Sequence, residues 1–204
     1  MQMQLQGANI VVVLSQPNKN AVRVNEILGL YPGEPHTTLW FPDPISPGVI
    51  EFPNKGIGIS LTENRLQIQS RVNDNFALND FSEILMKVLH LTGGQAVNAY
   101  GFNFDFICSG LPEVKDIFSL AIKPTSFENI PNTALRLSFT KDNVLFTLDL
   151  ADDKPNLKLH INIHHNESLN TDILAQRTSE TLENDWNNSQ KLIAEVIGSG
   201  NTLA

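Results

Sequence analysis

Three of the five histidines in this chain lie close together, and imidazole is the side chain that most often binds zinc or transfers protons. They are His160, His164 and His165, and the carboxylates of Asp149 and Asp105 precede them. On a strand, His160 and His164 share a face but lie about 13 Å apart. One zinc ion holds its nitrogen ligands at about 2.1 Å, so this pair does not form a zinc site. His165 points to the opposite face, and we therefore expect no metal and no cofactor.

Other signals for catalysis are weak. The acidic residues Asp149, Asp152 and Asp153 lack the glycine and the final glutamate of a calcium loop. Cys108 is the single cysteine, and no local signature supplies it with a base, so we expect it in the core. The chain contains no G-x-x-x-x-G-K-[ST], G-x-G-x-x-G or G-x-S-x-G motif. These observations favour a protein that is not an enzyme.

Two predicted strands carry polar side chains on one face. Over 97–108, aromatic side chains alternate with Asn103 and Asp105, and over 157–164, aliphatic side chains alternate with His160 and His164. Because successive side chains of a strand point to opposite faces, each set of polar residues lies on one side of its strand. These four residues are candidate binding residues, and a solvated sheet face is the simpler interpretation.

The segment 30–53 holds a second group of candidates. It contains six prolines, which fix the backbone and remove hydrogen-bond donors, and it predicts a long loop with 49–52 as a short edge strand. Its aromatic and imidazole side chains are Tyr31, His36, Trp40 and Phe41. Such residues either pack on the chain's own core or form an interface or a ligand lid, and the sequence leaves these alternatives open.

Apolar periodicity predicts the elements that must position these residues. Hairpins are predicted over 56–70 and 135–150, an amphipathic helix follows the first hairpin and ends at Gly93, and a last helix spans Thr178 to Ile197. The hairpins align without gaps at an offset of 78 (135 minus 57). This alignment predicts two duplicated strand-helix-hairpin-helix halves, 1–94 and 95–204, in one compact unit. The expected fold is α+β, with a mostly antiparallel sheet and helices on one side.

Composition limits the partners and the compartment. The chain of 204 residues has 22 acidic and 14 basic residues, and its net charge of -8 argues against binding to nucleic acid or to membrane surfaces. A single cysteine excludes an internal disulfide, and the N-terminal segment lacks the basic start and long apolar run of a signal peptide. We therefore expect a cytoplasmic protein.

Together these features predict a non-enzymatic binding or protein-interaction module that self-associates as a homodimer. Its partner is a protein or a second copy of the chain, and a small-molecule ligand is left open. One alternative is a metal-assisted hydrolase that uses His160, His164 or His165 with Asp149 or Asp105. Another is an acidic inhibitor or immunity-type protein that binds a basic partner. The sequence does not identify the ligand, the partner or the biological process.

Overall fold

The architecture comes from a computed structural model, which describes residues 2–41, 43, 46–71, 78–118 and 132–200. The described residues form one ten-stranded sheet in which all paired strands are antiparallel. From one edge to the other, the strands are β2 (Thr37–Trp40), β3 (Gly48–Phe52), β4 (Ile57–Thr62), β5 (Arg65–Arg71), β1 (Gln2–Leu14), β6 (Ala96–Ser109), β9 (Asn156–His165), β8 (Val144–Asp153) and β7 (Ala134–Lys141). A short strand, β10 (Leu169–Asn170), pairs with the beginning of β6. The expected α+β fold with a mostly antiparallel sheet is confirmed.

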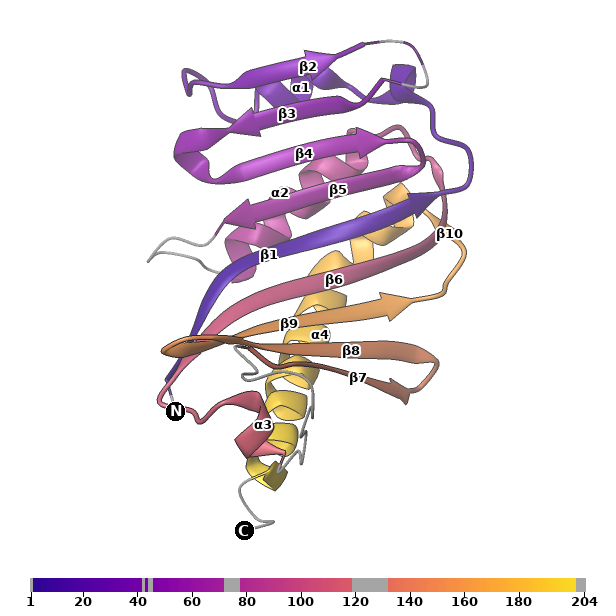
Figure 1. The fold of residues 1–204 in the computed structure, drawn as a ribbon. Helices are drawn as coiled ribbons and strands as arrows, with labels where there is room; N and C mark the ends of the chain where they lie inside the picture. The colour runs from indigo at the N-terminus through magenta and orange to yellow at the C-terminus, as the bar shows by residue number, and fades with distance from the viewer. Residues whose placement is uncertain (1, 42, 44–45, 72–77, 119–131, 201–204) are drawn as a thin grey trace.

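The two longest strands, β1 and β6, pair with each other at the middle of the sheet (Figure 1). Outward from β1 come β5, β4 and β3, and outward from β6 come β9, β8 and β7. The hairpin β4–β5 is therefore adjacent to β1, whereas β9 separates the hairpin β7–β8 from β6. The hairpins β4–β5 and β7–β8 therefore do not occupy equivalent positions in the sheet. The sequence alignment of these two hairpins at an offset of 78 residues does not match their places in the fold.

Two helices cover one face of the sheet. They are α2 (Leu78–His90) and α4 (Thr171–Gly200), which contact each other and lie behind the strands in Figure 1. The alternation of apolar side chains places one face of the central strands under these helices, with Ile10, Phe102 and Ile161 each fully buried. Burying a large apolar side chain stabilises the fold by about 1.5–3 kcal/mol, so this layer is the main source of stability.

Shorter elements surround this core. They are the helices α1 (Val24–Leu28) and α3 (Val114–Ile117) and the 3-10 turns η1 (Lys19–Ala21) and η2 (Pro53–Lys55). Among the helices in the described part of the chain, none has the length and apolar character that crossing a bilayer requires.

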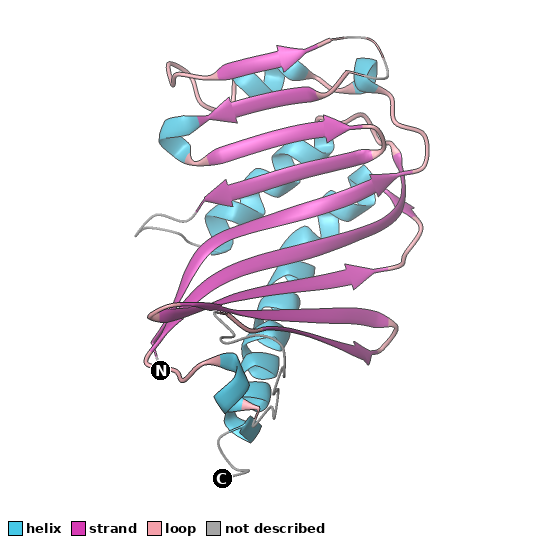
Figure 2. Cartoon of the chain, in the orientation of Figure 1, coloured by secondary structure: helices cyan, strands magenta, loops and turns pink. Residues whose placement is uncertain are grey.

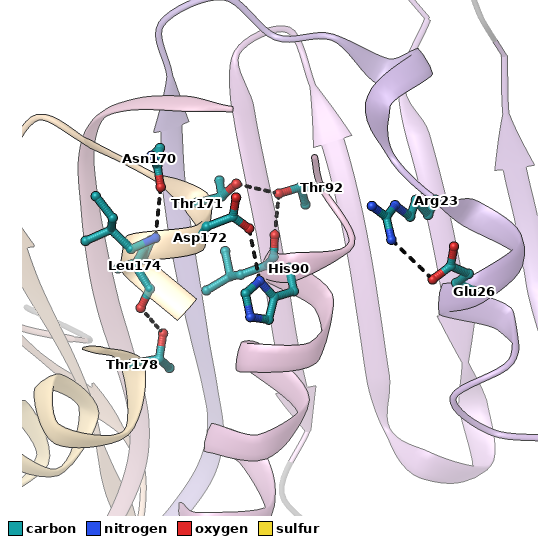
Figure 3. Close-up of polar contacts among 11 residues, drawn as sticks. Arg23, Glu26, His90, Thr92, Asn170, Thr171, Asp172, Leu174 and Thr178 are labelled. Atoms are coloured by element: carbon teal, nitrogen blue, oxygen red, sulfur yellow. Dashed lines mark hydrogen bonds and ion pairs between the residues drawn. The ribbon is translucent and has the colours of Figure 1, made fainter. Parts of the chain in front are cut away.

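The helix α4 begins at Thr171, earlier than the predicted start at Thr178. The side chain of Asn170 accepts a hydrogen bond from the backbone N–H of Ile173 at 2.8 Å and so caps the first turn (Figure 3). The same turn contacts the end of α2, because the hydroxyl oxygens of Thr92 and Thr171 lie 2.9 Å apart. These contacts fix α2 and α4 against each other at one end of the sheet.

The segment 30–53 is not a long loop. It contains two strands, β2 and β3, and β3 lies between β2 and β4 rather than at an edge. The prolines of this segment lie before or after these strands and not within them. The strands therefore keep the backbone N–H groups that pair them with each other and with β4. Residues 42, 44 and 45 of this segment lie outside the described residues.

Candidate functional site

The face of the sheet opposite α2 and α4 carries a set of polar side chains that hydrogen-bond to one another across the strands. In Figure 2, the helices lie on the far side of the sheet and the strands lie in front of them. We call this front surface the open face. The side chains of Asn103 and Asp105 on β6 and of His160 on β9 lie on this face, because their neighbours in sequence are buried under the helices.

A row of alternating charge crosses four strands of the open face. Asp105 on β6 is directly opposite His160 on β9, His160 is opposite Asp149 on β8, and Asp149 is opposite Arg136 on β7. The Nδ1 atom of His160 lies 2.7 Å from Oδ1 of Asp105. The Nε and Nη2 atoms of Arg136 donate to the two carboxylate oxygens of Asp149 at 2.6 and 2.7 Å. The register of three strand pairs therefore places four titratable groups in one line.

This arrangement shifts the pKa values of three of the four groups, and the hydrogen bonds to Asp149 raise the pKa of Arg136. The hydrogen bond to Asp105 raises the pKa of His160 above its usual value, although burial acts in the opposite direction. The hydrogen bonds from Arg136 lower the pKa of Asp149. The row therefore favours a charged imidazolium between two carboxylates.

A ladder of three amides lies beside this row. Asn103 donates from Nδ2 to Oδ1 of Asn9 on β1 at 2.8 Å, and it accepts from Nδ2 of Asn162 on β9 at 2.7 Å. Asn103 is only 6% exposed, so its amide is satisfied by these neighbours rather than by water. We call the seven residues of the row and the ladder the polar strip. They are Asn9, Asn103, Asp105, Arg136, Asp149, His160 and Asn162.

A groove of about 440 Å³ borders the polar strip. Side chains at the groove include Asp105, Asp149 and His160 from the strip, together with Gln6, Ile107, Ala151 and Lys158. Lys158 is paired with Asp153 at 3.1 Å. Within the described part of the chain, no three His, Cys, Asp or Glu side chains gather in a way that could hold a metal ion. The exposed lining of the groove is mainly apolar, so it can instead accept an apolar side chain or an amphipathic group beside His160.

The other two histidines of this segment are separated from His160. His164 is on the open face but lies four residues further along β9 than His160, opposite Gly101 and Leu145. His165 lies under α4, where its Nε2 atom is 2.7 Å from Oδ2 of the buried Asp185 and its ring stacks on Tyr100 at 4.6 Å. Burial raises the pKa of Asp185 and raises the pKa of Tyr100 to about 12. This buried cluster holds α4 on the sheet and has no access to the groove.

The candidates from 30–53 lie at the β2–β3 end of the sheet, away from the polar strip. Tyr31 and His36 both contact Phe52, with ring centroids at 4.9 and 6.1 Å. Trp40 packs over Gly48, so closely that a Cβ atom on Gly48 would lie 2.6 Å from the ring. Phe41 is 49% exposed. The eight predicted binding residues therefore do not form one site.

Several members of the polar strip were not among the predicted residues. Arg136 could have been found from the hairpin, since a turn at 142–143 places it opposite Asp149. Asn9 and Asn162 had no comparable signal, because they meet Asn103 through pairings between strands that are distant in sequence. Cys108 is buried as expected, and burial raises the pKa of its thiol.

Comparison with known proteins finds no protein-family model that matches the chain and no match among curated proteins.

Proposed function

We propose that this chain is a non-enzymatic protein-binding module and that the polar strip with its groove is the surface that contacts the partner. The observation that carries the proposal is the hydrogen-bonded order of the strip, in which Asp105 holds His160 and Arg136 holds Asp149 on adjacent strands. Side chains that are already fixed in the free protein lose little conformational entropy on binding, so more of the interaction energy is left for affinity.

The size of the strip favours a protein over a small molecule. It runs from β1 to β7 across five adjacent strands. Neighbouring strands lie about 4.8 Å apart, so the strip is about 19 Å long. A surface of this length matches a segment or a loop of a partner protein, and the groove matches one of its side chains.

The charge of the chain favours a basic partner. A net charge of -8 speeds association with a positively charged surface and slows association with an acidic one. Salt weakens such steering, so capture of the partner should fall as ionic strength rises.

The test is affinity purification of the tagged chain from its native cells, followed by reconstitution with the purified partner. The strip variant combines Asp105→Asn with His160→Gln, and the control is Glu180→Gln at an exposed position on α4. We expect the unmodified chain and the control to bind the partner equally, and the strip variant to bind at least about tenfold more weakly, as loss of a charged hydrogen bond predicts. Equal binding by the strip variant would show that the partner contacts another surface.

A second candidate, a metal-independent hydrolase, is favoured by the contact between Asp105 and His160 beside the groove. A carboxylate that orients a histidine is a common general-base arrangement. In this candidate, the neutral form of His160, which is present above its raised pKa, takes a proton from water as the water oxygen adds to a substrate carbonyl carbon, and the imidazolium then returns the proton to the alcohol that leaves as the ester bond breaks. Hydrolysis of a panel of nitrophenyl esters should then be lost in His160→Gln and kept in His164→Gln. If the unmodified protein shows no hydrolysis that depends on His160, this candidate is removed.

The strand order also supports a proposal about origin. We infer that the chain arose by duplication of a unit in which β1, β5, β4 and β3 correspond to β6, β9, β8 and β7. The matching order of strands on the two sides of β1 and β6 supports this correspondence.

A further inference from the structure

The strand β7 forms one edge of the sheet and has features that edge strands usually avoid. It is eight residues long, it contains no proline, and its register with β8 is continuous from Ala134 to Lys141. Among the described residues, no strand pairs with its outer side. The opposite edge strand, β2, is only four residues long. Proteins normally shorten, bulge or interrupt their edge strands because free N–H and C=O groups recruit other strands.

Charge does not protect this edge either. Arg136 is the only charged residue of β7 before its last position, and its guanidinium is held on the carboxylate of Asp149 by two hydrogen bonds. The positive charge is thus directed toward β8 and away from the free edge.

The turn that connects β7 to β8 defines which backbone groups face outward. Asp142 and Asn143 have φ values of 50° and 65°, as in a type I′ turn of two residues, and they are flanked by the pair Lys141 and Val144. In such a hairpin the flanking pair exchanges both hydrogen bonds, and hydrogen-bonded and non-hydrogen-bonded pairs then alternate. The backbone N–H and C=O groups that point away from β8 are therefore those of Ala134, Arg136, Ser138 and Thr140.

Apolar side chains line the side of β7 that lies toward the helices. Leu135 and Leu137 are partly buried against the core, and Phe139 is 37% exposed. A groove of about 260 Å³ separates β7 from α4, and Phe139, Phe146 and Leu192 line its apolar part. An added strand could bury its own apolar side chains at this position.

We propose that two copies of this chain join through β7, which pairs antiparallel with β7 of the partner about a two-fold axis at Leu137. In this register Ala134 is opposite the partner's Thr140, and Arg136 is opposite the partner's Ser138. All four residues with outward backbone groups are then paired in both copies.

In the same register, the side chains that face each other across the two β7 strands also match in polarity. Leu137 faces the partner's Leu137, and Leu135 faces the partner's Phe139, so every directly opposed pair on the helix side is apolar. An axis at Ser138 would instead place Leu135 opposite the partner's Lys141, and an axis at Arg136 would oppose two guanidinium groups. Cross-strand apolar pairs stabilise a sheet and opposed like charges destabilise it. This self-complementarity is the reason to assign a second copy, rather than an unrelated strand, as the occupant.

The first test measures mass in solution by light scattering and sedimentation. Ser138→Pro removes an outward N–H while leaving the hydrogen bonds to β8 in place, and Ser138→Ala keeps the N–H. We expect the unmodified chain and Ser138→Ala to be dimers of equal affinity. The dissociation constant of Ser138→Pro should rise at least about tenfold, because two intermolecular hydrogen bonds are lost. A Ser138→Pro variant that dimerises like the unmodified chain would overturn the proposal.

The second test remains informative if the proline variant does not fold. Two Leu137 residues on the axis would form a non-hydrogen-bonded pair with Cα atoms about 4.5 Å apart, which is within disulfide range. Leu137→Cys should therefore form a covalent dimer on mild oxidation. Leu145→Cys, at an exposed position on β8, should not, and the native Cys108 is buried. A monomeric unmodified chain, or an equal yield of covalent dimer from both variants, would show that β7 does not pair with itself.

Discussion

Oδ1 of Asp105 and Nδ1 of His160 lie 2.7 Å apart, directly opposite each other on β6 and β9. Both side chains are partly exposed, at 49% for Asp105 and 39% for His160, so water screens their attraction. The pair is therefore better suited to setting the protonation of His160 than to stabilising the fold.

The first prediction concerns the titration of His160. Asp105→Asn should lower the pKa of His160, because the hydrogen bond to Asp105 is the main cause of the raised value. The measurement is NMR titration of the imidazole protons. Asp153→Asn removes a carboxylate that pairs with Lys158 instead, and it should leave the His160 pKa unchanged. An unchanged His160 pKa in Asp105→Asn would show that Asp105 does not raise it.

This titration also has a consequence for stability. Because the pKa of His160 is raised in the folded state, the pair's contribution is fully present below the unfolded value of about 6.5. It is lost as the pH rises through the folded pKa. The free energy of unfolding of the unmodified chain should fall across that window relative to His160→Gln, as measured by urea denaturation at a series of pH values.

The second prediction concerns acid stability. The pKa of Asp149 is lowered by Arg136, so this pair's contribution is present above pH 3.8 and is lost as the pH falls through the folded pKa. Arg136→Gln should raise the pKa of Asp149 and should make the chain less stable above pH 3.8, while changing little at lower pH. Arg136→Lys, which keeps the charge without the two-pronged geometry, should be intermediate. Equal acid unfolding curves for the three proteins would contradict this account.

The third prediction concerns the buried pair of His165 and Asp185. Asp185→Leu leaves the polar His165 under α4 without its partner and should lower the free energy of unfolding by about 3 kcal/mol. The double variant His165→Leu with Asp185→Leu should lose less, because no unpaired polar group remains. Urea denaturation of both single variants and the double variant measures the coupling. If the losses in the two single variants add up to the loss in the double variant, the contact between His165 and Asp185 contributes little to the free energy of unfolding.

The fourth prediction concerns the close contact of Gly48 and Trp40. Gly48→Ala places a methyl group 2.6 Å from the indole ring, so Trp40 must move. Such overpacking costs about 1–3 kcal/mol. The control is Gly198→Ala in α4, where a Cβ atom meets nothing within 4 Å. Tryptophan fluorescence should shift in Gly48→Ala and stay unchanged in Gly198→Ala, and an unshifted spectrum in the first variant would count against the packing described.

Much of the secondary structure could be predicted from local pattern. Strict alternation of polar and apolar residues located β6 and β9, and helical spacing located α2. In the segment 30–53, the strand predicted at 49–52 is confirmed as β3, but its edge position and the loop predicted at β2 were wrong. Proline content describes a whole segment, whereas the hydrogen-bond ladder depends on each position. Its prolines lie outside β2 and β3, so the backbone donors of these strands remain. The predicted start of α4 was late because apolar spacing is clear only from Thr178, whereas the cap that begins the helix is Asn170.

The candidate site was predictable only within single strands. Alternation places Asp105 and His160 on polar faces, but it does not say that they are opposite each other. That relationship depends on the register of β6 against β9, which core packing over the whole sheet determines. Asn9 joins the strip for the same reason, through a pairing between strands at the beginning and middle of the chain.

The central position of β1 has a consequence for biosynthesis. The strand β1 leaves the ribosome before both of its neighbours, β5 and β6, and it lies between them in the finished sheet. Until residues 96–109 have been translated, one full side of β1 lacks its partner, and an unpaired strand is a site for aggregation. Nascent chains that stall before β6 should therefore depend on chaperones, and this dependence should fall once β6 has been translated and can pair with β1.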